Sequence, residues 1–422
     1  MRILWLKTEL LHPVDKGGKI RTYQMLKELK RQHHITYLCL DETMSTPAER
    51  EQALEYCHEV VCVPHQTRAK FSPGFYSDLA LNVITPLPYF IKKYESLPMR
   101  RKLRELTLRS QSDVLVCDFL VSSVNVPPAL PCATVLFQHN VEEIIWKRHY
   151  EVQKNKLKKA YLYSQWRKTR AYERAACRRF GHVIAVSRED REIMQSDYGV
   201  TAIDDVPTGV DIDFFKRSGR EVEDPHDIVF TGSMDWLPNE DAIRYFTERI
   251  MPLVKVAIPN ITLTVVGRNP YPGLVELSKR DPSIIVTGRV EDVRPYMERA
   301  AAFIVPLRIG GGTRLKIFEA MALEKAIVST SVGAEGLPVS DGNELRIADT
   351  PEAFAAAVVE LLKNPELAKR IGQQAAKTVR EKFGWAGVAK RFTEICETTI
   401  QEHGNLERTS AVEVRRHEQP AA

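Results

Sequence analysis

Short apolar runs alternate with stretches of helical periodicity along the first half of the chain. Each run is rich in Val, Ile and Leu and is bounded by polar or turn-forming residues, which is the pattern of a buried strand. The predicted strands cover residues 2–7, 34–40, 59–64, 113–119, 133–139 and 182–187. Strands that alternate with helices form parallel sheets with right-handed crossovers, so we predict an α/β protein. The last of these strands is expected to complete the first sheet.

The second half repeats this alternation after a polar, turn-forming segment near residues 206–222, which we interpret as a linker. Predicted strands begin near residue 228, end near residues 266 and 287, and cover residues 303–305, 326–330 and 345–348. Two helical runs follow, to Lys363 and over 364–382, and a third covers 386–402 after a break at 383–385. Residues 403–422 are polar and are expected to be disordered.

Composition and charge narrow the class of protein. A chain of 422 residues with 44% apolar content can form two α/β domains, each with its own core. The net charge of +5 is uneven, because residues 1–185 hold 30 Lys and Arg against 18 Asp and Glu, or +12, which leaves −7 for the remainder. The first half is therefore expected to face an anionic partner, for which nucleic acid and a lipid surface are both candidates on charge alone.

Other features of the composition favour a cytoplasmic protein. No apolar run reaches the roughly 18 residues of a membrane span, and the N-terminus has no apolar region of the signal-peptide kind. The seven cysteines are scattered without C-x-x-C spacing and lie mostly in apolar runs. We interpret them as buried, reduced thiols rather than as a disulfide framework or a zinc site.

The stretch 301–337 carries the most specific chemistry. A strand is followed by Gly310-Gly311-Gly312 and then by a helical pattern, which is the geometry of an anion site at a helix N-terminus. Arg314 and Lys316 fall in the first turn of that helix, where cations are disfavoured unless an anion lies beside them. The pattern favours a phosphate or diphosphate here, with Glu319 in range of a neighbouring sugar hydroxyl. An ordinary glycine-rich turn with solvated basic residues is the alternative.

This stretch resembles the nucleotide-sugar site of the retaining glycosyltransferases of family 4, which have the GT-B fold. That family frames the donor with two carboxylates spaced E-x7-E; here the second falls on Glu319 and the first position holds Gly311, as in the branch with GGGTRLK-type loops. The resemblance covers most of the chain and implies two Rossmann-like domains that face each other across a cleft. It places the acceptor-side domain in 1–206, the nucleotide-sugar domain in 207–385, and a helix crossing back in 386–402.

The resemblance also implies an activity. It is that of a retaining hexosyl- or N-acetylhexosaminyltransferase, moving a sugar from a nucleoside diphosphate sugar to a polysaccharide or lipid-linked glycan of the cell envelope. No cofactor is expected beyond this donor, and no metal, because the chain has no D-x-D to hold a diphosphate-bound Mg²⁺. The expected catalytic residues are His139, Arg314, Lys316 and Glu319.

Further donor contacts are expected from glycine loops at strand ends, where backbone N–H groups can approach a phosphate or sugar. In the first half such a loop follows the first strand, and the strand ends at Asp118 and at Gln138-His139-Asn140 point to the same edge of the sheet. In the second half, Arg268 is expected to replace the cations that many family members carry after their Gly-rich strand. The expected donor-binding residues are Gly17, Gly18, Gly232, Ser233, Arg268, Gly288, Arg289, Val290, Gly311, Gly312 and Thr313. Asn140 and Glu142 are weaker candidates.

Two basic segments remain, at residues 89–109 and 146–182. The second holds 12 Lys and Arg against 2 Glu, with aromatic residues at roughly helical spacing. It is typical either of a solvated helix face or of an amphipathic helix on an anionic bilayer, which predicts peripheral attachment at the cytoplasmic face of the membrane. The rival functions are a non-catalytic or epimerase-like sugar-nucleotide-binding protein, a phosphorylase and, remotely, a nucleic-acid-binding protein. We expect no nucleic-acid partner, since one would leave the second-half glycine loops unexplained.

Overall fold

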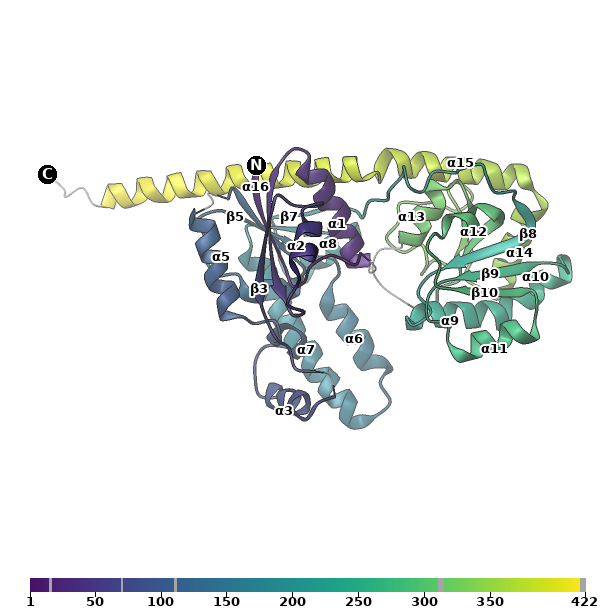
Figure 1. Cartoon of the computed structure of the whole chain (residues 1–422), viewed down its shortest axis with the longest axis horizontal. Helices are drawn as coiled ribbons and strands as arrows, with labels where there is room; N and C mark the ends of the chain where they lie inside the picture. The colour runs from purple at the N-terminus through teal and green to yellow at the C-terminus, as the bar shows by residue number, and fades with distance from the viewer. Residues whose placement is uncertain (15–16, 70, 110–111, 310–314, 418–422) are drawn as a thin grey trace. The chain divides into compact units, whose positions relative to one another are not determined.

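The computed structural model describes residues 1–14, 17–69, 71–109, 112–309 and 315–417. The chain forms two compact units, one made of Met1–Pro207 with Val388–Ala422 and the other of Thr208–Gly387. Each unit is built on a parallel sheet covered by helices (Figure 1). The predicted α/β class is confirmed. The units change after Pro207 and after Gly387, whereas the expected domain boundaries were at 206 and 385.

The first unit contains a seven-stranded parallel sheet in the order β3-β2-β1-β4-β5-β6-β7. The five inner strands β2, β1, β4, β5 and β6 are fully or largely buried, so they read in the sequence as continuous apolar runs, whereas the edge strands β3 and β7 are only partly buried. The strands are β1 (Arg2–Lys7), β2 (His34–Asp41), β3 (Glu59–Pro64), β4 (Val114–Asp118), β5 (Ala133–Phe137), β6 (His182–Ala185) and β7 (Ile203–Asp205). The helices are α1 (Gly17–Lys30), α2 (Pro47–Ala53), α3 (Pro73–Asn82), α4 (Tyr89–Lys92), α5 (Leu97–Arg109), the 3-10 helix η1 (Leu120–Asn125), α6 (Glu142–Val152), α7 (Lys156–Arg179) and α8 (Arg188–Ser196).

The second unit contains a six-stranded parallel sheet in the order β10-β9-β8-β11-β12-β13. Its strands are β8 (Asp224–Thr231), β9 (Thr262–Val266), β10 (Ile284–Gly288), β11 (Ala300–Val305), β12 (Ala326–Ser329) and β13 (Arg346–Ile347). The helices are α9 (Leu237–Tyr245), the π-helical turn η2 (Phe246–Ile250), α10 (Met251–Ala257), α11 (Pro272–Arg280), α12 (Arg294–Arg299), α13 (Leu315–Ala322), α14 (Pro351–Lys363) and α15 (Pro365–Lys382). In both sheets the strand order reverses beside the first strand, which makes the β1/β4 and β8/β11 positions topological switch points.

The last helix, α16 (Trp385–His417), starts in the second unit and joins the first from Val388 onward. Its Phe392 is fully buried, with its ring centroid 5.6 Å from that of Trp5 on β1 and 5.3 Å from that of Phe137 on β5. The first core therefore includes a segment from the far end of the chain.

Three predictions at segment ends were wrong. The first sheet does not end with the strand at 182–187, because β7 adds an edge strand whose Asp205 accepts a hydrogen bond from Arg191 at 2.6 Å. The strand predicted to begin near residue 228 begins at Asp224 as β8, and its Asp227 is buried and accepts from the Thr264 hydroxyl at 2.8 Å. Residues 403–417, expected to be disordered, continue α16; they contain no proline, and seven of the fifteen are the helix formers Arg, Glu, Ala and Leu.

The states of the cysteines and the hydropathy of the helices can be compared with the expectations from the sequence. All seven cysteines are free; six are buried, and Cys62 is partly exposed with its Sγ 3.8 Å from that of Cys39. None of the helices in the described ranges combines the length and apolar character that crossing a bilayer requires.

Gly372 on α15 gives a test of the packing in the second unit. A Cβ at this position would lie 2.1 Å from the backbone oxygen of Glu324, which a side-chain movement cannot relieve. We expect Gly372→Ala to destabilise this unit by about 1–3 kcal/mol, as for other overpacked sites, and to lower its thermal unfolding midpoint by several degrees. Gly387→Ala on α16 is the matched control, because a Cβ there meets nothing within 4 Å. Equal midpoints for the two variants in circular dichroism melts would contradict this packing.

Candidate active site

The first unit gathers buried polar residues at the switch point of its sheet. Lys7 ends β1 and Asp118 ends the neighbouring strand β4, while His139 follows β5, the next strand along. Thr22 on α1 and Trp5 on β1 complete a group that we call the Asp118 cluster. All five side chains are at least 95% buried. Ligands of open parallel sheets bind outside the carboxyl ends of the strands at a switch point, so the cluster lies where a ligand site is expected.

Asp118 is the common acceptor of this cluster. Its Oδ2 lies 2.7 Å from Lys7 Nζ, 2.7 Å from the Thr22 hydroxyl and 3.1 Å from Trp5 Nε1. Its Oδ1 lies 2.7 Å from His139 Nε2. Lys7 Nζ also donates to the Thr22 hydroxyl at 2.9 Å, so the three elements that carry these residues are tied together without water. A buried carboxylate needs this many donors to offset the loss of its hydration.

The charges of the cluster follow from these contacts. Burial alone would raise the pKa of Asp118, but Lys7 and His139 outweigh it and hold that pKa well below its usual range. Burial lowers the pKa of His139 to about 3, although Asp118 favours the protonated ring. At neutral pH Asp118 is therefore ionised and His139 neutral. An ionised carboxylate only accepts, so His139 carries its proton on Nε2 and presents Nδ1 as an acceptor.

Phe119 closes one side of the cluster. It follows Asp118 with φ of 70°, in the left-handed region that a bulky residue adopts only when its surroundings demand it. Its ring stacks on His139 at 3.7 Å between centroids, and Lys7 Nζ lies 4.3 Å from the same ring. A Cβ on Gly18 would lie 2.8 Å from the Phe119 ring, so this site requires glycine. Gly17, the other predicted glycine, is the exposed first residue of α1.

The segment that carries His139 is held from behind by Glu173 on α7. This fully buried carboxyl accepts from the side chain of Gln138 and from the backbone N–H groups of Glu142 and Glu143, each at 2.9 Å. Tyr198 donates to it at 2.9 Å as well. Burial and the nearby Glu142 raise the pKa of Glu173 to about 8, and burial raises the pKa of Glu142 to about 7. Glu173 thus caps α6 and fixes the backbone on both sides of His139.

The second unit has a contrasting site at its own switch point. After β8 the chain turns through residues 232–236, the Gly232 loop, into α9. Asn239 on α9 is buried; it donates to the Ser233 carbonyl at 2.8 Å and accepts from Lys316 Nζ at 2.8 Å. Lys316, on α13 after the neighbouring strand β11, also lies 4.0 Å from the ring centroid of Phe230. A cation is therefore held directly beside the glycine loop.

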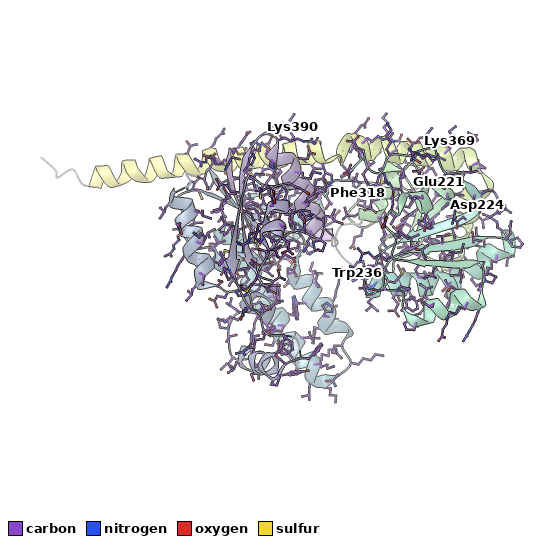
Figure 2. All side chains as sticks on the ribbon, in the orientation of Figure 1. Glu221, Asp224, Trp236, Phe318, Lys369 and Lys390 are labelled. Atoms are coloured by element: carbon purple, nitrogen blue, oxygen red, sulfur yellow. The ribbon has the colours of Figure 1, made fainter. Side chains whose placement is uncertain are left out.

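Close backbone approach explains the glycines of this site. Gly232 has φ of 154°, and a Cβ there would lie 2.7 Å from the Asn239 amide and 2.8 Å from Lys316 Nζ. A Cβ on Gly267, at the end of β9, would lie 1.8 Å from the Gly232 carbonyl oxygen. A larger residue at Gly267 would require the backbone to move, and one at Gly232 would displace the Asn239 and Lys316 side chains. Trp236, at the N-cap of α9, is 44% exposed beside this loop (Figure 2).

The remaining predicted residues of the second unit occupy different settings. Arg268 Nε donates to the Ser233 hydroxyl at 2.8 Å, so the structure brings Arg268, Ser233, Gly232 and Lys316 together. Burial raises the pKa of Glu319 to about 7, against the opposing effect of Lys316 one turn earlier. Gly288, with φ of 69°, ends β10, where it is followed by an exposed Arg289 and a partly buried Val290. Gly310, Gly311, Gly312, Thr313 and Arg314 lie outside the described residues.

Four residues at these sites were missed by reasoning from the sequence. Lys7 and Thr22 in the first unit bind Asp118, and Arg21 beside them is buried, which lowers its pKa to about 9. The available signal for Lys7 was a cation at the carboxyl end of a strand, directly after four apolar residues. Asn239 lies 77 positions from Lys316 in the sequence, so no local pattern links the two side chains.

Comparison with protein families agrees with this architecture. Residues 16–214 match the family model described as Glycosyltransferase Family 4, and residues 225–364 match the model described as Glycosyl transferases group 1. Together the two models span most of the chain, one in each unit. The chain therefore belongs to the family 4-like glycosyltransferases of the GT-B fold and is a glycosyltransferase.

Individual relatives are distant but similar along their whole length. An uncharacterized 44.6 kDa protein in the cps region of Klebsiella pneumoniae is 23% identical over 394 residues, which cover 90% of this chain and 96% of the relative. HepE of Anabaena, solved with UDP, has a TM-score of 0.62 at 14% identity and covers 94% of this chain and 100% of its own. WaaG, a glycosyltransferase involved in lipopolysaccharide biosynthesis, has a TM-score of 0.62 at 14% identity, with 93% and 99% coverage.

The neutral, buried state of His139 predicts a pH dependence of stability. The folded pKa of about 3 lies below the value of about 6.5 expected for an unfolded chain. As the pH falls below 6.5 the unfolded state takes up a proton that the folded state does not, so this residue removes stability. The loss should reach about 2 kcal/mol at pH 5, at 1.4 kcal/mol per pH unit.

Urea unfolding of the first unit at pH 7, 6 and 5 measures this effect. We expect His139→Gln to lose about 2 kcal/mol less stability than the wild type between pH 7 and pH 5, because the substituted residue does not titrate. Parallel curves for the two proteins would show that His139 is already protonated, or accessible to protons, in the folded state.

Proposed function

We propose that this chain is a retaining glycosyltransferase that takes its sugar from a nucleoside diphosphate sugar. The observation that carries the proposal is the arrangement of Gly232, Asn239 and Lys316 at the β8/β11 switch point. There a glycine loop without a Cβ, a helix N-terminus and an ammonium group meet within hydrogen-bond distances. These are the components of a diphosphate site. The structures of HepE with UDP and with UDP-glucose support the choice of ligand by analogy.

In this proposal the second unit binds the donor. Lys316 and Arg268 supply positive charge to the diphosphate, and the N-terminus of α9 contributes backbone N–H groups. Trp236 offers an exposed aromatic surface beside the loop. Glu319, one turn after Lys316, is proposed to accept from a ribose or sugar hydroxyl. In this proposal Lys316 and Arg268 balance the negative charge of the diphosphate, and no step is assigned to a metal ion.

The proposed reaction is a same-face substitution. The bond between the anomeric carbon and the leaving phosphate breaks, the acceptor oxygen bonds to the same face of that carbon, and the departing phosphate takes the acceptor proton. Charge that develops on the leaving diphosphate is stabilised by Lys316, Arg268 and the described helix N-terminus. His139 is proposed to contact the transferred sugar through Nδ1, which the Asp118 hydrogen bond fixes as an acceptor.

The acceptor is proposed to be a polysaccharide or lipid-linked glycan, and a surface of the first unit supports attachment to an anionic membrane. Helices α6 and α7 pair into an arm that α3 joins (Figure 1), with Asn82 at the end of α3 accepting from Gln165 of α7 at 2.9 Å. The turn and start of α7 carry Lys154, Lys156, Lys158 and Lys159. Seven large apolar residues of the arm and its flanks are exposed: Phe71, Tyr76, Leu81, Val83, Ile84, Leu157 and Tyr163.

Exposed apolar side chains next to lysines are the chemistry of an interfacial membrane anchor. Ile84 and Leu157 are each 85% exposed, so most of their apolar surface is free to contact a membrane. The location in a cps region of the Klebsiella relative is consistent with a glycan of the cell surface. We propose that the arm holds the protein at the membrane that carries its acceptor.

Lys316→Ala tests the donor site. A charge-assisted hydrogen bond to a phosphate contributes about 1.5–3 kcal/mol, so we expect the Kd for the preferred nucleoside diphosphate to rise at least tenfold. Calorimetric titration with UDP, GDP and ADP measures this, and it also identifies the base. Lys369→Ala on α15 is the matched control, since it removes an exposed lysine from the same unit (Figure 2).

Each outcome of that titration has a distinct meaning. An unchanged Kd in Lys316→Ala would exclude this lysine from the donor site. Donor binding that is intact in the wild type, without transfer or hydrolysis of any sugar nucleotide, would favour the non-catalytic alternative.

The double variant Leu157→Asp/Ile84→Asp tests the membrane arm. We expect it to bind vesicles of anionic phospholipid at least tenfold more weakly than the wild type in sedimentation assays, because both apolar contacts are replaced by like charges. Val222→Asp/Val256→Asp is the control, with valines that are 86% and 84% exposed in the second unit. The arm would be excluded if both variants bound equally, or if the wild type bound only neutral vesicles.

A further inference from the structure

The first unit also contains a pocket near the C-terminal end of η1, whereas the Asp118 cluster lies near the N-terminal end of η1. The pocket has a volume of about 480 Å³ and lies between α5, η1 and the end of α7. Its lining consists of Leu97, Arg100, Arg101, Arg104, Val124, Val126, Pro127, Pro128 and Arg179. This volume is within the range of small-molecule sites. The pocket uses none of the residues assigned to the donor or to the Asp118 cluster.

The charge of this arginine pocket is one-sided. Four arginines line it and no Asp or Glu does. Arg100 is paired with Glu95 at 2.7 Å from outside the lining, and it also donates to the Val124 carbonyl at 3.0 Å. Three guanidinium groups of like sign therefore share one concavity without a carboxylate in its wall. Such an arrangement is stabilised by a bound anion, and the planar fork of arginine matches phosphate oxygens.

The remaining lining is apolar and rigid. Val124 and Val126 are more than 90% buried, two prolines follow them, and Leu97 at the start of α5 is 63% exposed. An inorganic anion would use only the arginines and would leave the exposed apolar lining residues Leu97 and Pro128 in contact with water. A ligand with a charged head and an apolar substituent would cover both.

Two of the arginines also hold η1 in place. Arg100 donates to the Val124 carbonyl and Arg179 to the Ser123 carbonyl, at 3.0 and 2.9 Å. At the other end of η1, the Ser122 hydroxyl donates to the Asp118 carbonyl at 2.8 Å, next to Phe119. An occupant of the pocket would thus contact the segment that leads directly into the Asp118 cluster.

We propose that the arginine pocket binds a phosphorylated amphiphile, that is, a phosphate or diphosphate ester with an apolar substituent. The phosphate oxygens contact Arg101, Arg104 and Arg179, and the substituent lies on the exposed apolar lining residues Leu97 and Pro128. The ligand can be a free molecule or a lipid in a bilayer, since the chemistry recognised is the same. This site is independent of the donor site in the second unit.

Calorimetric titration with geranyl diphosphate and with inorganic pyrophosphate tests the proposal. We expect the wild type to bind geranyl diphosphate at least tenfold more tightly than pyrophosphate at this site. Arg101→Glu/Arg104→Glu should remove one geranyl diphosphate site per chain while leaving the Kd for the preferred nucleoside diphosphate unchanged. These two arginines are exposed, so the variant should keep the wild-type melting temperature. Lys27→Glu/Lys390→Glu changes the charge of the first unit equally at two exposed lysines outside the pocket and the arm, and should keep the site.

Several results would overturn the proposal. Undiminished geranyl diphosphate binding in Arg101→Glu/Arg104→Glu would show that the pocket is not the site. Equal affinity for pyrophosphate would show a simple anion site without an apolar part. Titration with anionic phospholipid vesicles distinguishes the sources: weaker vesicle binding by the variant in addition to the lost soluble site indicates a bilayer lipid, and unchanged vesicle binding indicates a free ligand. A loss confined to vesicles would mean that the arginines act only as surface charge.

Discussion

The first unit depends on a carboxylate that is fully removed from water. Asp118 can remain ionised at the end of β4 only because Lys7, Thr22, Trp5 and His139 supply donors from the neighbouring elements. Removing one partner of such a pair typically costs 3–5 kcal/mol, because the other charge stays buried. The same contacts fix the tautomer of His139 and place the Phe119 ring on it. One interaction therefore sets both the packing at the switch point and the chemistry of the histidine.

The switch point of the second unit is stabilised by different contacts. Its central constraint is backbone proximity, because Gly267 and Gly232 approach too closely for any Cβ, and Asn239 and Lys316 fill the adjoining space. This leaves a cation and backbone groups beside the strand ends instead of a neutralised carboxylate. The two units thus share the strand order around the switch point, but one has a buried, paired carboxylate there and the other has a cation beside a glycine loop.

The sequence was most informative where a strand is buried on both faces. Parallel strands such as β1 read as continuous apolar runs, so their bounds could be predicted closely. β7 was missed because two of its three residues are aspartates, which are rare in strands. Arg191 and Arg391, which lie on other elements, form ion pairs with them. The helical continuation of α16 past residue 402 was missed because a polar composition was taken as disorder, although the residues themselves favour a helix.

The candidate sites could be predicted only where their residues form a local pattern in the sequence. Glycine loops and strand ends can be recognised locally, and the structure brings Gly232, Ser233, Arg268 and Lys316 together. The partners Lys7, Thr22 and Asn239 depend on which strands are neighbours, and residue spacing does not contain that information. His139 was chosen by family resemblance, and only the structure shows that Asp118 orients it.

The central claim is that the chain transfers a sugar from a nucleotide donor with retention of configuration. Proton NMR of the first-formed product, with an α-linked nucleoside diphosphate sugar and a membrane glycolipid extract as acceptor, tests it most directly. The account predicts that the anomeric proton of the transferred sugar keeps the small coupling constant of the α configuration. A first-formed β-linked product would contradict it.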